Sequence, residues 1–364
     1  MKAVVTADLH IHPWRECSND NGADRLDDGL SVLRQTLAFA RERKCAWICL
    51  GDLKHSKGMW LLPVLNGVLE VFREYEDVPK ILLHGNHDGV SGNRSGLDAF
   101  RSLPTVWVFD QPDPVSEDLP LWKVALWPHQ PTLDALPKFL ADARQAKVRV
   151  LLAHVFLRGV ALGPDDVRLD QGIPLEVLGL AGKNKVFRMA FLGDVHKSQS
   201  LGKKNEAAIL YVGSPLALNW GEREEGKCAW YVDTEGPDVE SLLVRAPGFF
   251  VEDWSASEKG ARDKLKVTIQ TAESGGCWLK GQFIRLILPP GADPKLVERL
   301  CEVSGARALQ VIVQRAAQAE QRAPKLHAAL TAGQMVEEYV RARPPEGLDV
   351  KMVATAGKRL WREQ

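Results

Sequence analysis

The sequence predicts an α/β protein followed by a smaller unit. Over the first half, short apolar runs alternate with stretches of helical periodicity, which is the pattern of sheets covered by helices. Most of these runs end in glycine, aspartate or histidine, as buried strands do where they lead into loops. Near residues 234–250 the pattern changes, and a shorter set of strands with a helix follows.

Six segments of the first half are predicted as buried strands because each is too short for a helix and most are rich in leucine or β-branched residues. They are residues 3–7, 46–50, 80–83, 149–152, 189–192 and 209–212. Residues 23–43 carry leucines at helical spacing with Asp24 as the expected cap, and residues 60–75 form a second predicted helix. No helical pattern separates residues 107–110 from 121–127, so we expect an antiparallel part there.

The second half is predicted to contain a small unit and a helical tail. Three strands and one helix are expected at residues 264–270, 283–288, 309–314 and 293–303. Two amphipathic helices, 332–341 and 349–362, have apolar faces that pack on their own domain or against a partner protein. We therefore divide the chain into residues 1–245, 246–322 and 323–364.

Composition restricts the class of protein. The chain has 364 residues, and its 47 Lys and Arg balance its 47 Asp and Glu, which argues against a wholesale basic nucleic-acid binder but allows local basic patches. The six cysteines are scattered without a CxxC pair, which suits a reducing compartment and argues against a zinc ribbon. The N-terminus does not resemble a signal peptide and no apolar stretch is long enough for a membrane span, so we expect a cytoplasmic protein.

Five segments place a metal-binding side chain directly after a predicted strand. They are Asp8-Leu-His10, Gly51-Asp52, Gly85-Asn86-His87-Asp88, His154 and Gly193-Asp194-Val-His196. Open α/β sheets form their sites at the carboxyl ends of strands, so these side chains are expected to converge. Carboxylate, amide oxygen and imidazole suit Mn²⁺, Fe or Zn²⁺, and a buried aspartate can bridge two ions. The pattern therefore predicts a two-metal centre for phosphoryl-transfer chemistry.

In order and residue type, these segments resemble the motifs of the calcineurin-like metallophosphoesterase superfamily, over residues 1 to about 233. Within it, Gly51-Asp52-Leu53-Lys54-His55 is similar to a segment of the SbcD-type nucleases, the catalytic subunits of double-strand-break repair complexes. Residues 211–222, YVGSPLALNWGE, resemble the segment that follows the last metal motif in those nucleases. The resemblance implies a two-sheet sandwich flanked by helices, a capping domain that binds DNA, and a terminal segment that binds a coiled-coil ATPase.

The resemblance also implies a role for each motif residue. Asp8, His10 and His196 would hold one metal, Asn86 and His154 the other, and Asp52 would bridge both. His87, oriented by Asp88, would stabilise charge or protonate the leaving oxygen, and His55 would contact or orient the phosphate. The expected cofactors are two divalent ions, Mn²⁺ first and Mg²⁺ as the alternative. Four basic residues near the motifs are expected to contact DNA phosphates: Lys54, Lys57, Arg94 and Lys197.

Asp194 is a departure from the family pattern, which has histidine at this position. A carboxylate can still bind the second metal as an oxygen donor, and its charge would favour harder ions such as Mn²⁺ or Mg²⁺. The alternative is that Asp194 does not reach the metal and the second site is weak.

The resemblance thus implies a Mn²⁺-dependent DNA exonuclease and single-strand endonuclease in recombination, repair or replication, partnered by an SbcC-like ATPase. A homodimer through the helix at 60–75 is expected, with burial in the core as the other reading. Two other functions stay open: a stand-alone metallophosphatase or nucleotide phosphodiesterase, and a DNA-end-binding scaffold with an impaired second metal site. His12 extends Asp8-x-His10 to an Asp-x-His-x-His pattern that is also found at the start of amidohydrolase and PHP-type barrels, but the later motifs of this chain fit those barrels poorly. His84 and His129 are expected to be structural or rim residues.

Overall fold

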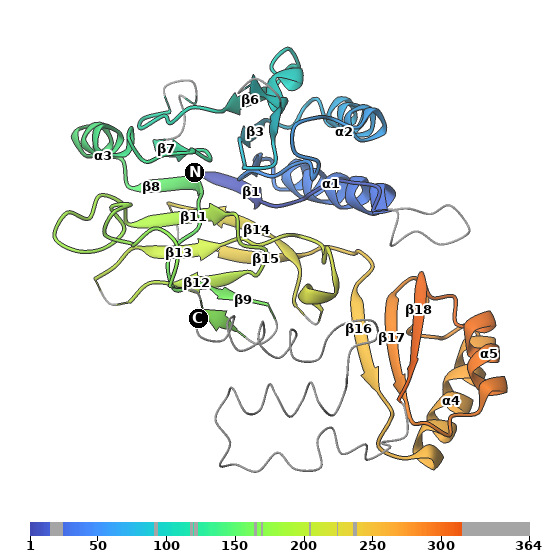
Figure 1. Ribbon diagram of the computed structural model, residues 1–364. Helices are drawn as coiled ribbons and strands as arrows, with labels where there is room; N and C mark the ends of the chain where they lie inside the picture. The colour runs from blue at the N-terminus through green and yellow to red at the C-terminus, as the bar shows by residue number, and fades with distance from the viewer. Residues whose placement is uncertain are drawn as a thin grey trace, which may run out of the picture.

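Two β-sheets packed face to face form the body of the protein, and a third, smaller sheet lies to one side (Figure 1). The computed structural model describes residues 1–314 except residues 15–24, 91–93, 117–118, 120–122, 164–165, 169, 204, 224 and 236–238. The expected cap Asp24 and the expected helices at 332–341 and 349–362 lie outside the described residues.

The first sheet has six strands in the order β15-β14-β1-β2-β3-β6. They are β1 (Lys2–Thr6), β2 (Ala46–Cys49), β3 (Lys80–Leu83), β6 (Val106–Phe109), β14 (Cys228–Asp233) and β15 (Val239–Leu243). Strands β1, β2, β3 and β6 are mutually parallel, whereas β14 runs antiparallel to both of its neighbours. The four parallel strands therefore have their carboxyl ends on the same side.

The second sheet has five strands in the order β12-β13-β11-β8-β7. They are β7 (Val124–Trp127), β8 (Val150–His154), β11 (Met189–Gly193), β12 (Gln199–Leu201) and β13 (Ala208–Tyr211). Strands β7, β8, β11 and β13 are mutually parallel, and β12 runs antiparallel to β13. Residues 107–110 do not pair with 121–127, because β6 and β7 are edge strands of different sheets; the expected antiparallel part is limited to one bridge between Asp113 and Leu126. The chain passes from one sheet to the other here, so no crossover helix is required.

Helices cover the outer faces of both sheets (Figure 1). Helices α1 (Arg25–Glu42) and α2 (Leu62–Glu74) pack on the first sheet, where Leu33, Trp47 and Phe72 share one core. Helix α3 (Leu136–Gln145) packs on the second sheet, with the ring of Phe139 4.9 Å from that of Trp127. Both helices predicted in the first half are confirmed, because leucine and valine recur on the faces that they bury.

The core between the two sheets is formed by the inner faces of both. Val5 and Ile48 of the first sheet share one cluster of buried side chains with Leu152 and Phe191 of the second. This sandwich confirms the predicted fold class and brings the carboxyl ends of strands from both sheets close together.

Residues 249–313, which we call the small unit, form a parallel three-stranded sheet covered on one face by two helices (Figure 1). Its elements are β16 (Phe249–Asp253), α4 (Glu258–Glu273), β17 (Phe283–Leu288), α5 (Pro294–Val303) and β18 (Ala308–Val313). Leu265 of α4 and Leu300 of α5 are buried against Ile284 and Leu286 of the sheet. The small unit therefore has a core of its own.

The strand expected at 264–270 is wrong, since these residues lie within helix α4. The side chain of Ser257 caps this helix by accepting a hydrogen bond from Gly260 N at 3.0 Å. Ala261, Leu265 and Ile269 recur at intervals of four and face the core. The first strand of the small unit is instead β16. It begins at the end of residues 234–250, the stretch where the sequence pattern changes, and β15 lies inside that stretch.

Short elements complete the described chain. They are β4 (Gly89–Val90), β5 (Arg94–Ser95), β9 (Ala161–Leu162), β10 (Val167–Arg168) and two 3₁₀ helices, Gly96–Phe100 and Trp220–Glu222. Among the described residues, no helix combines the length and the apolar character needed to cross a membrane.

Candidate metal centre

The strand-end side chains of both sheets converge on one place. Asp8 and His10 follow β1, Asp52 follows β2, and Asn86 follows β3 of the first sheet. His154 ends β8, and Asp194 and His196 follow β11, both in the second sheet. The site therefore exists only because the two sheets pack with these strand ends together.

The backbone at these strand ends is unusual. Asp8, His10, Asp52 and Asp194 all have positive φ values, of 52°, 45°, 56° and 88°. Non-glycine residues rarely adopt this region, and such conformations concentrate at functional sites. Gly51 and Gly85 leave room for the centre, because a Cβ at Gly51 would collide with the ring of His154 and one at Gly85 with the carboxylate of Asp52.

Two overlapping groups of ligand atoms form the centre. The first contains Asp8, His10 and His196, whose ligand atoms lie within 4.8 Å of one another. The second contains Asp8, Asp52 and His154 under the same limit. Asp52 Oδ2, in the second group, is 3.7 Å from His154 Nε2 of that group and 3.5 Å from His10 Nε2 of the first, so it lies close to a histidine of each. This is the place that a bridging carboxylate requires.

Asn86 and Asp194 complete the second group. The Oδ1 atom of Asn86 lies 3.1 Å from His154 Nε2, and Asp194 Oδ1 lies 3.5 Å from the same nitrogen. The backbone N–H of Asp194 donates to the carboxylate of Asp8 at 3.1 Å. Asp194 therefore faces the centre with its carboxylate while its main chain supports a ligand of the first group.

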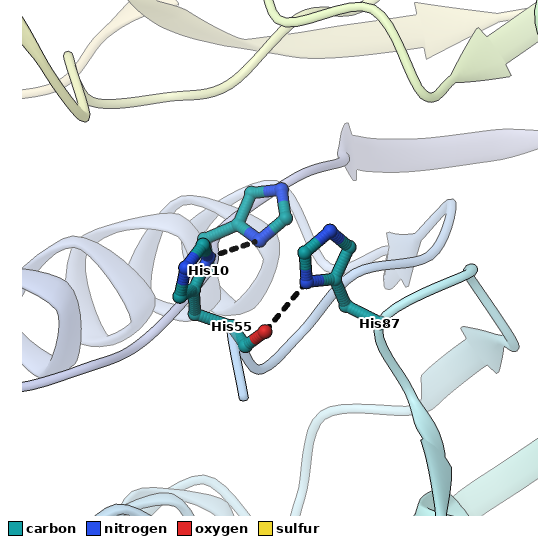
Figure 2. A group of neighbouring side chains, drawn as sticks. All are labelled: His10, His55 and His87. Carbon is teal, nitrogen blue, oxygen red and sulfur yellow. Dashed lines mark hydrogen bonds between the residues drawn. The ribbon is translucent and has the colours of Figure 1, made fainter. Parts of the chain in front are cut away.

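Each imidazole of the centre is held through Nδ1, which leaves Nε2 to face inward. His154 Nδ1 donates to Leu50 O at 2.7 Å, and His196 Nδ1 contacts Glu222 Oε1 at 2.9 Å. Figure 2 shows the same arrangement for His87, whose Nδ1 donates to the carbonyl of His55 at 2.5 Å. His10 Nδ1 lies 3.3 Å from His55 Nδ1 (Figure 2). Such partners fix the tautomer of metal-ligating histidines.

The donor atoms fit divalent cations better than they fit one another. The Nε2 atoms of His10 and His196 face each other at 3.1 Å, although neutral rings with protonated Nδ1 atoms have no proton to share there. The inward atom of the Asn86 amide lies 2.9 Å from Asp52 Oδ2, so an amide oxygen there would face a carboxylate oxygen without a proton between them. A cation between these atoms satisfies all of them, whereas a metal-free chain would turn the amide over to donate.

Burial makes the charges of the centre interdependent. Burial raises the pKa of Asp8, against the opposing effect of His154 and His196. Burial lowers the pKa of His10 far below its usual range, and the neighbouring His196 lowers it further. Burial also disfavours the charged form of His154, but Asp52 and Asp194 outweigh it and raise its pKa to about 10. The metal-free centre thus holds a proton on His154 that a metal ion would displace.

Asp88 does not orient the ring of His87, which corrects the expected role. Its carboxylate is fully buried and accepts hydrogen bonds from the N–H groups of Asp52 at 2.8 Å and Gly85 at 2.9 Å. A third N–H, that of Leu53, donates to it at 3.1 Å. Asp88 therefore fixes the loop that carries Asp52, while the carbonyl of His55 holds His87.

His55 lies at the rim of the centre with His12 behind it. The ring of His55 is stacked 5.1 Å from that of His87 and lies 4.2 Å from Trp14. Burial and the proximity of His87 lower the pKa of His55 to about 4, so it is neutral near pH 7. His12 Nδ1 contacts Ser56 Oγ at 3.3 Å, and the ring of His12 lies 5.3 Å from that of His55.

The four basic residues expected to contact phosphate differ in accessibility. Lys54 is 1% exposed and its ammonium donates to the carbonyls of Ser56, His87 and Gly89, so the expected DNA contact is wrong for this residue. Lys197 donates to Asp166 Oδ1 at 2.5 Å and to Gly163 O at 2.9 Å. Lys57 and Arg94 are exposed.

Glu222 is the residue of the site that the sequence did not single out. It is buried, contacts His196, and pairs with Lys227 at 2.8 Å. The sequence feature that could have identified Glu222 is its position as the last residue of the segment 211–222, which resembles the recombination nucleases. His129, at the end of β7, is half-buried with its ring 6.3 Å from that of His154, and His84 is half-buried after β3, as expected for rim residues.

The chain was compared with known proteins. No curated sequence gives a significant match. Among solved structures, it is similar to a dimetal phosphatase from Danio rerio, with 13% identity over 64% of this chain and 93% of that one and a TM-score of 0.40. It is also similar to the nuclease MPE from Pseudomonas putida, with 17% identity over 66% of this chain and 87% of that one and a TM-score of 0.30. A putative 5′-nucleotidase from Staphylococcus aureus shows 14% identity over 74% of this chain and 58% of that one, with a TM-score of 0.41.

The family comparison gives a direct answer. The model of the calcineurin-like phosphoesterase family matches residues 1–198, which is more than half of the 364 residues. The matched region contains every strand-end ligand from Asp8 to His196. The chain therefore belongs to the calcineurin-like phosphoesterase family.

Proposed function

We propose that this protein is a metal-dependent DNA phosphodiesterase of the SbcD type, an exonuclease and single-strand endonuclease that processes DNA ends in recombination, repair or replication. Family membership supports the coarser part of this proposal, a hydrolase of phosphate esters with a two-metal centre. The finer part, DNA as substrate, depends on one observation about residues 214–222.

This segment, which in sequence resembles the recombination nucleases, lies between the metal centre and the small unit. Leu218 and Asn219 line the pocket of about 270 Å³ that also contains Asp52, His87 and His196. The next residue, Trp220, has its ring 5.0 Å from Phe249 of the small unit. A polymer crossing the pocket would meet both the body and the small unit, whereas a small ester needs only the pocket. This placement favours a polymeric phosphodiester.

The side chains of the centre have distinct tasks in such a reaction. When bound, two divalent ions would activate water and neutralise charge on the phosphate. His87 lines the pocket and donates its Nδ1 proton to His55 O, so only its imidazolium form carries a proton on Nε2. That form can protonate the leaving oxygen through Nε2. Neutral His55 can donate one hydrogen bond to a phosphate oxygen at the rim.

Mn²⁺ is the proposed resident metal. The second group offers a carboxylate at Asp194 together with Asp52 and the amide oxygen of Asn86, a set richer in oxygen than the family pattern. Oxygen-rich sites favour harder ions, so Mn²⁺ and then Mg²⁺ suit the second group better than Zn²⁺ does.

Two protein partners belong to the same proposal. We propose that residues 323–364 bind an SbcC-like coiled-coil ATPase; this segment lies outside the described residues, and its amphipathic sequence supports the proposal. We also propose a homodimer around the start of α2. There Met59 and Leu62 are 60% and 70% exposed, and a second copy of the chain would cover them.

The test compares polymeric and small substrates. The purified full chain is incubated with Mn²⁺ and either end-labelled linear duplex DNA, circular single-stranded DNA, or p-nitrophenyl phosphate. An Asp52→Asn variant purified in parallel controls for contaminating nuclease, since loss of the bridging ligand should abolish activity of the protein itself. We expect Mn²⁺-dependent cleavage of both DNAs by the wild type only.

Other outcomes have clear meanings. Rapid hydrolysis of the small ester without DNA cleavage would replace the nuclease by a stand-alone phosphoesterase. No hydrolysis of any substrate, with anomalous scattering from one metal in excess Mn²⁺, would favour the scaffold with an impaired second site. Pull-down of a coiled-coil ATPase that is lost on removal of residues 323–364 would support the partner proposal.

A further inference from the structure

Residues 214–222, which we call the bridging segment, contact a metal ligand on one side and the small unit on the other. The segment ends in the 3₁₀ helix Trp220–Glu222, whose start is capped by Asn219 Oδ1 accepting from Gly221 N at 2.7 Å. Trp220 and Glu222 therefore belong to one short, capped turn. One turn of backbone is all that separates the two side chains.

On the metal side, Glu222 is held by more groups than a surface carboxylate would be. Its Oε1 lies 2.9 Å from His196 Nδ1, and its Oε2 accepts from Lys227 Nζ at 2.8 Å and from Leu218 N at 3.2 Å. The hydroxyl of Ser214 also donates to Oε2, at 3.2 Å. Glu222 is 7% exposed, so its position is determined by these partners rather than by solvent.

The electrostatics agree with an ionised Glu222. Burial alone would raise its pKa, but the hydrogen bond with His196 and the charge of Lys227 outweigh burial and lower the pKa to about 2. An ionised carboxylate can only accept from His196 Nδ1, so that nitrogen carries the proton and Nε2 faces the centre.

On the side of the small unit, Trp220 is enclosed by two of its strands. Its ring meets Phe249 of β16 edge to face at 5.0 Å, and the guanidinium of Arg285 of β17 lies over it at 4.2 Å. Phe249 in turn stacks on Phe283 at 4.7 Å. A second attachment comes from Arg25, which donates to the carbonyl of Ala217 and packs over both phenylalanines.

We infer that Glu222 is a positioning residue for His196, and that the bridging segment couples the orientation of that ligand to the docking of the small unit. A ligand or partner that shifts the small unit would change the affinity of the first metal site. This inference concerns the metal centre whatever its substrate, so it does not depend on the DNA proposal.

The first experiment tests the positioning role with a matched pair of variants. Glu222→Ala removes the contact with His196, and Glu225→Gln changes a neighbouring carboxylate that pairs with the same Lys227 at 2.8 Å. Ring-nitrogen NMR of the metal-free full chain reports the His196 tautomer, and calorimetry with Mn²⁺ reports affinity. We expect that His196 in Glu222→Ala no longer keeps its proton fixed on Nδ1. We also expect the Mn²⁺ affinity of one site to fall by about 10–100-fold.

Glu225→Gln is expected to keep both the tautomer and the affinity. Glu222→Gln retains an oxygen acceptor of similar shape, so its Mn²⁺ affinity is expected to lie between those of Glu222→Ala and Glu225→Gln. If Glu222→Ala does not fold, Glu222→Gln tests the positioning role in its place. Wild-type affinity and tautomer in Glu222→Ala, or an equal loss in Glu225→Gln, would overturn the positioning role.

The second experiment tests the coupling with two tryptophans of different placement. Trp220→Ala removes the contact with β16 and β17, whereas Trp278→Ala removes a ring that is 46% exposed and lies 6.2 Å from Phe250. We expect Trp220→Ala to weaken Mn²⁺ binding at one site about fivefold or more, a typical size for coupling between sites. Trp220→Phe should restore most of it, and Trp278→Ala should have no effect.

Unchanged metal affinity in Trp220→Ala would overturn the coupling and leave the role of Glu222 to the first experiment. An equal loss in Trp278→Ala would show a general effect of small-unit stability and would also overturn it. Neither experiment uses a substrate, so their outcomes are separate from those of the nuclease test.

Discussion

At the scale of single residues, hydrogen bonds to one atom of each side chain decide which other atom faces the metal centre. The Nδ1 atoms of His154, His196 and His87 are bound by Leu50 O, Glu222 and His55 O, so their Nε2 atoms face inward. Asp52 uses Oδ1 to accept from His87 N at 2.7 Å and keeps Oδ2 for the centre. Preorganised donors of this kind lose little entropy when an ion binds.

Asp194→His tests how the unusual carboxylate tunes the second metal group. The imidazole would be a softer ligand and would remove one negative charge near His154, now 3.5 Å away. We expect the ratio of Zn²⁺ to Mn²⁺ affinity at this group to rise by about tenfold or more. Calorimetric titration with each metal measures it.

Asp166→His serves as the control, because Asp166 is an exposed carboxylate paired with Lys197 outside the two ligand groups. An unchanged metal preference in Asp194→His would mean that Asp194 is not a ligand.

At the scale of elements, the loops after β2 and β3 form one structure. Asp88 ties them together through the N–H groups of Asp52 and Gly85, and the loops approach so closely that Gly85 has no space for a side chain. The loop that carries Asp52 is therefore only as stable as its contact with its neighbour.

Gly85→Ala is the corresponding prediction. A Cβ at this position would overlap the backbone N and the carboxylate of Asp52, so the loops must separate. We expect a loss of about 1–3 kcal/mol in the free energy of unfolding, measured with urea, together with weaker metal binding. Gly226→Ala, where a Cβ meets no atom within 4 Å, should change stability by less than about 0.5 kcal/mol. Equal effects of the two substitutions would refute the close-packing argument.

At the scale of the whole molecule, a buried ionic cluster docks the small unit on the body. Asp28 of α1 accepts two hydrogen bonds at 3.0 Å from Arg307 Nη1 and contacts Arg25 Nη1 at 3.2 Å. Burial raises the pKa of Asp28, although both arginines oppose this. A carboxylate shared by two arginines fixes orientation more than it adds stability.

Asp28→Ala should therefore weaken the docking. Two largely buried guanidinium groups would lose their counter-charge, at a cost on the order of 3 kcal/mol. We expect the unfolding of the small unit and of the body to separate into two transitions in calorimetry. Asp27→Ala, an exposed neighbour on the same helix, should unfold as the wild type does. A single unshifted transition in Asp28→Ala would count against the ionic cluster as the docking contact.

The sequence by itself determined six strands of the two sheets, the two helices of the first half and the strand-end motifs, because each depends on contiguous residues and on periodicity. It misread residues 264–270, where the cap at Ser257 and the spacing of Ala261, Leu265 and Ile269 support a helix. It also assigned Asp88 to His87 because the two are adjacent, although hydrogen bonds join Asp88 to a loop 36 residues earlier.

Only the tertiary structure decided which partners meet. It buried Lys54 among carbonyls, placed Glu222 against His196, and set the bridging segment against the small unit. These contacts form between residues far apart in the chain, where the two sheets and the small unit pack together. No local pattern encodes them, because the free energy that selects them comes from burial shared by the whole molecule.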